Sequence, residues 1–239
     1  MMKKLIFALI VAMLLVPIVL AVNAKQLEPL DKITFIHYKD GTAKIVGGAA
    51  KAPICYKLMG IKWNTLPVKY VINPTNPQGL SASLITSAIS VSAETWDAFT
   101  SKELFNNVYE IDYSATWDDT PDKVDNKNEY VFGTYSDNNV IAVTNIWYTR
   151  FGKQIVDYDV LFNTYYTWKD CPIAGTDCSK AMDLQNIATH ETGHGIGLSD
   201  IYTSSCSAVT MYGYSWYGDV GKRSLEQADI TGLQKLYGQ

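Results

Sequence analysis

The sequence predicts an α+β fold, with one sheet formed largely by the first half of the chain and helices concentrated in the last third. Short runs rich in valine, isoleucine and tyrosine at residues 68–72, 140–148 and 155–162 have the composition of β-strands. Helical patterns occupy residues 81–100 and much of the chain after residue 183. With 239 residues, 47% of them apolar and 18% charged, the chain can form one well-buried globular domain or two small ones.

The first expected elements are strands followed by one amphipathic helix. A strand at residues 33–38 and a returning strand at 43–46 flank a turn, and a flexible glycine- and alanine-rich link follows at 47–50. The helix at 81–100 then presents a single apolar stripe, which indicates that one face packs on the core. The stripe is formed by Ile85, Ala88, Ile89, Trp96 and Phe99.

The later elements are an irregular segment and two helices. Residues 109–137 are acidic and have no clear period, so they are expected to be irregular. Asp183 is placed to cap the helix that follows it. The last helix is expected to start at Ser224, with Gln227 three residues on completing a capping box, and to end at Gly238.

The first 24 residues have the features of an export signal. Lys3 and Lys4 precede an apolar run at residues 5–20, and small residues at 22–24 fit a signal-peptidase site, so cleavage is expected after residue 24. An uncleaved anchor helix is the alternative, because about 18 apolar residues can just span a bilayer. Either way the remainder is expected to be secreted or extracellular. Residues 25–53 are then a propeptide or an N-terminal extension, and 54–239 form the main domain.

The overall charge limits the classes of partner. The formal net charge is −4, whereas nucleic-acid binders usually carry a basic patch, so no nucleic-acid partner is expected. The longest apolar run lies in the signal segment, which excludes a protein with several membrane spans and leaves no expected membrane contact beyond that segment. We expect a monomer.

Four cysteines remain in the exported part: Cys55, Cys171, Cys178 and Cys206. An even number in an exported chain indicates two disulfides. Cys171 and Cys178 flank a short loop that a disulfide would close at low cost, which leaves Cys55 for Cys206. Three pairings are possible, and the sequence does not choose among them. No Cys-x-x-Cys spacing occurs, so a cysteine metal site is not indicated.

His190-Glu191-Thr192-Gly193-His194 is a His-Glu-x-x-His motif on an expected helix. Residues four apart share a helix face, so both imidazoles can reach one metal ion, and neutral ring nitrogens suit zinc. Glu191 lies near a water on that metal, where it can take a proton and pass it to the leaving amine. The chain has three histidines and the motif uses two of them. The motif therefore predicts a catalytic zinc site rather than a coincidental spacing on a surface helix.

A catalytic zinc site needs a third protein ligand and an open fourth position. Gly197 can adopt a left-handed conformation that ends the helix and turns the chain back, which brings Asp200 to the metal as an oxygen ligand. The alternative is that Asp200 is an ordinary loop carboxylate and that Glu226 is the third ligand. Further along, Met211 lies in a tight turn, where its role is mainly packing.

The extended motif His-Glu-x-x-His-x-x-Gly-x-x-Asp with a downstream Met-turn resembles the metzincin metalloendopeptidases. The pattern that includes Leu225, Asp229 and Gly238 is similar to the closing helix of the matrixin branch. Residues 155–163 are similar to the matrixin strand and loop ahead of the active-site helix. The resemblance covers roughly residues 55–239.

This resemblance implies a twisted, mostly parallel five-stranded sheet with three helices and two lobes around a zinc cleft. It implies that His190, His194 and Asp200 hold zinc and that Met211 lies beneath the metal. It also implies that an edge strand near residues 140–144 pairs with the backbone of a protein or peptide substrate. The wall of the S1′ pocket would be built by Tyr212, Tyr214 and Trp216.

The sequence also departs from the usual matrixin pattern. Asp200 stands where most matrixins have a third histidine, and the cysteine latency motif of matrixin propeptides and the extra histidines of their structural zinc site are absent. Cys55 as a thiolate that silences the zinc is one interpretation, and a disulfide with Cys206 is the favoured one. His37 is interpreted as an ordinary strand residue.

The sequence therefore predicts an exported zinc-dependent endopeptidase that hydrolyses peptide bonds through a zinc-bound water activated by Glu191. The alternative is a non-catalytic secreted binding or adhesion domain that retains the fold. The intact Glu191 argues against that alternative, because a purely structural site needs no base there. The cluster Asp118, Asp119, Asp122 and Asp125 is interpreted first as a solvated loop, and a structural calcium ion held by these carboxylates is the alternative.

Overall fold

The structure, a computed structural model, describes residues 28–39, 54–121 and 123–239 of the chain. The expected signal peptide, the returning strand at 43–46 and the link at 47–50 therefore lie outside the described residues. Three α-helices occur in the described part: α1 (Ala82–Asp97), α2 (Leu184–Gly195) and α3 (Gln227–Tyr237). None of these helices is long and apolar enough to cross a membrane.

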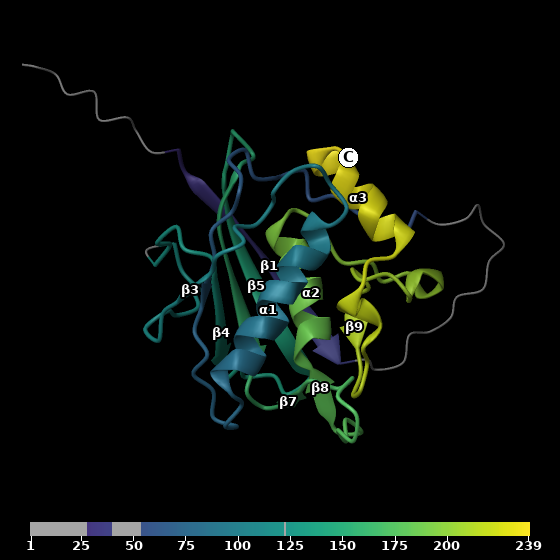
Figure 1. Ribbon diagram of the computed structural model, residues 1–239. Helices are drawn as coiled ribbons and strands as arrows, with labels where there is room; N and C mark the ends of the chain where they lie inside the picture. Colours follow the sequence, from purple (N-terminus) through teal and green to yellow (C-terminus); the bar gives the residue numbers. More distant parts are fainter. Residues whose placement is uncertain (1–27, 40–53, 122) are drawn as a thin grey trace, which may run out of the picture.

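Within the described ranges, seven strands form the main sheet in the order β3-β2-β4-β6-β5-β1-β9, and two more form a separate pair, β7-β8. The helices α1 and α2 lie beside each other across one face of the main sheet (Figure 1). The strands are β1 (Leu30–Lys39), β2 (Val71–Ile72), β3 (Glu110–Ile111), β4 (Glu129–Gly133), β5 (Val140–Thr149), β6 (Ile155–Asn163), β7 (Thr167–Lys169), β8 (Ala181–Asp183) and β9 (Tyr214–Ser215).

Strand directions confirm the expected α+β class with a mostly parallel sheet and three helices. Strands β3, β2, β4 and β6 are mutually parallel, and β5 runs antiparallel to β6. The five neighbouring strands β3, β2, β4, β6 and β5 match the number of strands that the resemblance implies. The sheet then continues past β5 with β1, which is antiparallel to β5 and parallel to β9.

Two expectations about the elements were wrong. The stretch 109–137, expected to be irregular, contains β3 and β4. Its strand β4 escaped the pattern because it is short and opens with a charged residue, Glu129, which is buried here. The last helix begins at Gln227 rather than Ser224, because Glu226 and Asp229 form the capping box.

Helix α1 fixes the position of α2 within the core. Its N-cap is Ser81, and Ile85, Ile89 and Trp96 of the expected stripe are buried, whereas Phe99 lies beyond the helix end and is exposed. The indole N–H of Trp96 donates a 2.9 Å hydrogen bond to the carbonyl of Thr189 in α2. The two helices are therefore joined by a polar contact inside an apolar interface, which sets their relative rotation.

Helix α2 begins at the expected cap and is buried along most of its length. The Asp183 carboxylate accepts a 2.8 Å hydrogen bond from the N–H of Asn186, and it also accepts one from Arg223 Nε at 2.7 Å. A helix buried on all sides places the polar side chains of its motif inside the molecule, so each of them must find a partner there.

Two disulfides tie down the loops around this core. Cys55 is bonded to Cys206, and Cys171 is bonded to Cys178. The first joins the segment before β2 to the segment that leads to β9, across 151 positions of sequence. With Cys55 in a disulfide, the interpretation of Cys55 as a thiolate on the zinc finds no support in the structure.

Candidate active site

Three ligand-type side chains converge at the C-terminal half of α2. His190 Nε2 lies 3.2 Å from Asp200 Oδ1, and His194 Nε2 lies 3.4 Å from the same oxygen. All three atoms are buried, and none has a hydrogen-bond partner among the described residues. Ligand atoms that surround a tetrahedral zinc ion at about 2.0–2.2 Å lie roughly 3.4 Å apart, so the three atoms have the spacing of zinc ligands.

Hydrogen bonds on the far side of each imidazole determine which nitrogen faces the cluster. His190 Nδ1 donates to the carbonyl of Thr210 at 2.7 Å, and His194 Nδ1 donates to the carbonyl of Leu198 at 2.8 Å. Because a neutral imidazole carries one proton, Nε2 of both residues keeps its lone pair. Two nitrogen lone pairs and a carboxylate oxygen therefore face one another, and a shared cation removes their repulsion.

The turn after α2 brings Asp200 back to the helix. Gly197 has a φ of +104°, and a Cβ at this position would lie 2.5 Å from the carbonyl oxygen of Ile61. Both facts require glycine. Tyr202 Oη donates a 2.9 Å hydrogen bond to Asp200 Oδ2, which leaves Oδ1 directed at the histidines. Glu226, the alternative third ligand, lies instead at the N-cap of α3.

Met211 packs against α2 within its motif. It is buried, and a side chain on Gly193 would collide with the Met211 sulfur. The turn that holds Met211 is anchored by Asp229 of α3, which accepts hydrogen bonds from the N–H of Thr210 at 2.8 Å and of Met211 at 3.2 Å. Because Thr210 also accepts the hydrogen bond from His190, the turn links α3 to the histidine cluster.

The Glu191 side chain reaches two strands of the sheet. Its Oε2 accepts a 2.6 Å hydrogen bond from Thr144 Oγ1 on β5, and its Oε1 lies 2.9 Å from His37 Nδ1 on β1. Burial raises the pKa of Glu191 to about 7, against the opposing effects of the His194 charge and the Thr144 hydrogen bond. A carboxyl group with a pKa near neutrality can both accept a proton and return it.

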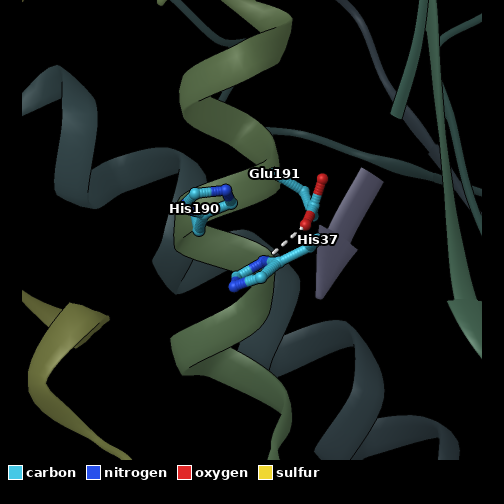
Figure 2. A group of neighbouring side chains, drawn as sticks. All are labelled: His37, His190 and Glu191. Atoms are coloured by element: carbon cyan, nitrogen blue, oxygen red, sulfur yellow. Dashed lines mark hydrogen bonds and ion pairs between the residues drawn. The ribbon is translucent and has the colours of Figure 1, made fainter. Parts of the chain in front are cut away.

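Side chains of β1 complete the cluster, as Figure 2 shows for His37. His37 extends from β1 toward α2, and its Nε2 lies 3.1 Å from Ser215 Oγ. The ring centroids of His37 and His190 are 4.0 Å apart, and Phe35 stacks on His194 at 3.9 Å. His37 is a strand residue as expected, but the structure brings all three histidines of the chain together.

Comparison with known families agrees with this geometry. The family model described as matrixin matches residues 62–238. The chain belongs to the matrixin family. Membership supports a zinc-dependent metallopeptidase, a hydrolase with protein substrates, and it confirms the resemblance that the extended motif indicated. The matched region of this matrixin contains every element from β2 to α3, whereas β1 lies outside it.

Buried charges in the matrixin site favour a bound cation. Burial lowers the pKa of His190 to about 3, and the nearby Lys222 ammonium adds to this effect. Burial opposes the ionisation of Asp200, yet His194 and His190 hold its pKa well below the usual range. The Asp200 charge in turn raises the pKa of His194 in spite of burial. Asp200 is therefore held as a carboxylate and His190 as a neutral imidazole, which are the protonation states in which these groups bind a metal ion.

Sequence reasoning missed several side chains that hold this matrixin site together. Thr144 gave no signal, because threonine is common in strands. Lys222 is 3% exposed and donates to the carbonyl of Tyr212, and no sequence pattern marks a lysine as buried. His37 had one available signal, namely that a chain with three histidines places two of them in a metal motif.

A second group of acidic side chains is buried around β4 and β6. Asp118 Oδ2, Glu129 Oε2 and Asp157 Oδ1 have no hydrogen-bond partner among the described residues. Burial raises the pKa of Glu129 to about 9 and those of Asp157 and Asp159 to about 8, and neighbouring carboxylates add to each effect. Potential ligand atoms of Glu129, Asp157 and Asp159 lie within 4.8 Å of one another.

The expected cluster of loop carboxylates divides in the structure. Asp118 and Asp125 join Asp157 of β6 in a group whose potential ligand atoms also lie within 4.8 Å of one another. Asp119 instead forms an exposed ion pair with Lys123 at 2.8 Å. Asp122 lies outside the described residues. The sequence therefore located part of this acidic group but not its partners on β4 and β6.

Proposed function

We propose that this matrixin is a secreted zinc-dependent endopeptidase that uses Glu191 as its general base. The observation that carries the proposal is the convergence of His190 Nε2, His194 Nε2 and Asp200 Oδ1, which are buried and unpartnered among the described residues. Two neutral imidazoles and a carboxylate are a donor set that zinc binds, and they leave a fourth position for chemistry. Family membership supports the same metal.

When bound, zinc supplies Lewis acidity toward a peptide carbonyl and toward water. Glu191 then accepts the proton that the attacking water loses and donates it to the amine of the leaving peptide. Thr144 holds Glu191 Oε2 at 2.6 Å, so Oε1, which His37 Nδ1 contacts at 2.9 Å, is the oxygen that would exchange that proton. Thr210 and Leu198 keep the two imidazoles oriented through their Nδ1 atoms.

Metal analysis of the purified chain tests the ligand assignment without relying on activity. We expect about one zinc per chain. The variants His190→Ala and Asp200→Ala should lose it, because each removes one of three protein ligands. Glu226→Ala is the matched control and should keep it. Full zinc occupancy in Asp200→Ala would refute the assignment of Asp200.

Hydrolysis of casein tests the proposed role of Glu191. In chains cut between residues 39 and 54, which separates β1 from the rest of the protein, Glu191→Ala should retain zinc but lose cleavage, because the base is removed while all three ligands remain. The alternative, a secreted binding or adhesion domain that keeps the fold, predicts bound zinc and no cleavage that depends on Glu191. If the unaltered chain and Glu191→Ala both hold zinc and cleave casein at equal rates, a contaminating peptidase is the source of the cleavage.

We also propose a structural calcium ion at the acidic group around β4 and β6. Calcium takes oxygen ligands, and carboxylates that are buried close together are stabilised by a divalent cation. The support is that oxygens of Asp118, Glu129 and Asp157 are buried without a hydrogen-bond partner among the described residues. Isothermal titration of calcium into chelator-treated protein tests this, and no binding at millimolar calcium would contradict it.

Export is the remaining part of the proposal. Two disulfides favour an oxidising compartment, and the first 24 residues have the features of a signal peptide. N-terminal sequencing of the protein recovered from culture medium is expected to begin at residue 25. A chain that stays with the membrane fraction and begins at residue 1 would instead indicate an uncleaved anchor.

A further inference from the structure

Strand β1 occupies the side of β5 that would otherwise be an edge of the sheet. The pairing runs antiparallel from Leu30, opposite Thr149, to Tyr38, opposite Val140. It therefore covers residues 140–144, the stretch that the family resemblance assigns to the substrate backbone. Because a strand has one set of backbone groups on each side, no peptide can add to β5 while β1 is in place.

The end of β1 is held on its other side as well. Tyr38 and Lys39 pair in parallel with Tyr214 and Ser215 of β9, so this part of β1 lies between β5 and β9 (Figure 1). The register with β5 shifts between His37 and Tyr38. Such a bulge redirects a side chain locally, and it occurs here at the residue that contacts Glu191.

Alternate side chains of β1 cover the candidate active site. Phe35 lies flat on the ring of His194, with an interplanar angle of 12°. His37, two residues on and therefore on the same face of the strand, lies against His190 and Glu191. Thr34 is on the opposite face, where its hydroxyl bonds Asn145 Oδ1 at 2.6 Å.

His37 contacts the oxygen of Glu191 that the proposed reaction uses. With the Glu191 carboxylate as acceptor, His37 Nδ1 donates to Oε1 at 2.9 Å and Nε2 accepts from the hydroxyl of Ser215 at 3.1 Å. Thr144 already holds Oε2. Both oxygens of the proposed base are therefore engaged, and the imidazole stands where a water would have to approach Oε1.

The cover formed by β1 leaves little access to the site. His37 is 1% exposed, and His190, Glu191 and His194 are fully buried. A surface cavity of about 290 Å³ lies beside Asp200, but Thr34, Phe35, Ile36 and Tyr38 of β1 form one of its walls. A peptide chain has no open path to Glu191 in this arrangement.

We propose that residues 30–39 are a built-in inhibitory strand, which occupies the peptide-binding edge of β5 and engages Glu191 through His37. This inference rests on the proposed peptidase function and adds how peptide cleavage is inhibited in the intact chain. The strand lies outside the region that the matrixin family model matches, so the catalytic domain and its inhibitor are separate parts of one chain. Displacement of β1 exposes the edge of β5 and frees Glu191 Oε1.

The test compares casein cleavage by full chains that differ only in β1. His37→Ala should raise the rate roughly 10- to 100-fold, because it removes a hydrogen bond to a charged group in the silent state. Thr34→Ser on the opposite face is the matched control, because it keeps the hydroxyl that bonds Asn145 Oδ1, and it should stay within about three-fold of the unaltered chain. Equal rates for the unaltered chain and His37→Ala would overturn the role of His37.

A second measurement does not depend on how His37→Ala folds. A recognition sequence for a site-specific protease replaces residues 44–50, and the folded chain is cut there and passed over a gel-filtration column. Release of the N-terminal piece should activate cleavage, and a synthetic peptide of residues 28–39 should inhibit again, with weaker inhibition by its His37→Ala form. An uncut chain that is as active as the cut one would overturn the inference while leaving the peptidase proposal intact.

The same peptide separates the two proposals when no activity is found. If the cut chain holds zinc and binds the labelled 28–39 peptide in a His37-dependent way, yet cleaves nothing, the strand occupies the site as inferred and the peptidase proposal fails. If the cut chain is active but neither binds nor is inhibited by the peptide, the inhibitory role of β1 is wrong.

Discussion

Thr144 of β5 donates a 2.6 Å hydrogen bond to Oε2 of Glu191 on α2, and both side chains are fully buried. The strand proposed to receive the substrate backbone is therefore also the strand that orients the proposed base. A buried carboxylate with one oxygen held in this way has little rotational freedom left. The same contact lowers the pKa of Glu191 against the larger effect of burial.

Replacing Thr144 by valine keeps the shape of the side chain and removes this hydrogen bond. We expect kcat/KM for casein cleavage to fall roughly 10- to 100-fold, because a buried hydrogen bond to a charged group is lost. Zinc content should not change, and Thr144→Ser should recover most of the rate, because it restores the hydroxyl. The rates should be compared in chains cut between residues 39 and 54. Unaltered kcat/KM in Thr144→Val would show that Thr144 does not position Glu191.

The hydroxyl of Tyr202 is expected to tune zinc affinity through Asp200. It donates a 2.9 Å hydrogen bond to Oδ2, which holds Oδ1 toward the histidines. Loss of a hydrogen bond to a metal ligand typically weakens binding about 10- to 100-fold, so Tyr202→Phe should lose zinc to a competing chelator at a lower chelator concentration. Tyr214→Phe is the control. The Tyr214 ring lies 5.2 Å from the Tyr202 ring, but the hydrogen bond to Asp200 comes from Tyr202.

Local sequence signals were sufficient for the helix that carries the motif. Asp183 was expected as a cap and is one, and the four-residue spacing of His190 and His194 does place both on one face. The glycine at 197 indicated the return of the chain toward Asp200. These features depend on residues close together in sequence, where helix geometry alone fixes the arrangement.

Contacts between segments far apart in the sequence could not be predicted from the sequence pattern. The contact between His37 and Glu191 spans 154 positions, and it exists because β1 pairs with β5. The start of α3 was misplaced for a related reason, because Asp229 serves both the capping box and the turn at Met211. A pattern within one segment does not reveal a residue that a distant segment also requires.

Calcium is expected to raise the thermal stability of the protein through the buried acidic group. A ligand that binds the folded state alone adds about 2.7 kcal/mol when its concentration is 100 times Kd, which shifts Tm upward by several degrees. Asp157→Asn should abolish the shift, because it removes a ligand whose Oδ1 is unpartnered among the described residues. Asp119→Asn is the control, because that carboxylate pairs with Lys123 at the surface. A Tm that does not respond to calcium would argue against the site.

Gly197→Ala is expected to destabilise the fold and disturb the zinc site together. The left-handed backbone costs alanine about 1–2 kcal/mol, and relief of the clash with the Ile61 carbonyl adds a further cost, so the total should be about 2–5 kcal/mol. Gly175→Ala separates the two effects, because Gly175 has a φ of +84° but no atom within 4 Å of the added Cβ. Denaturant unfolding should therefore show a smaller loss for Gly175→Ala, and only Gly197→Ala should also reduce zinc content. Equal losses of unfolding free energy in the two variants would mean that the contact with the Ile61 carbonyl adds no cost. Unchanged zinc content in Gly197→Ala would mean that the turn can relax around Asp200.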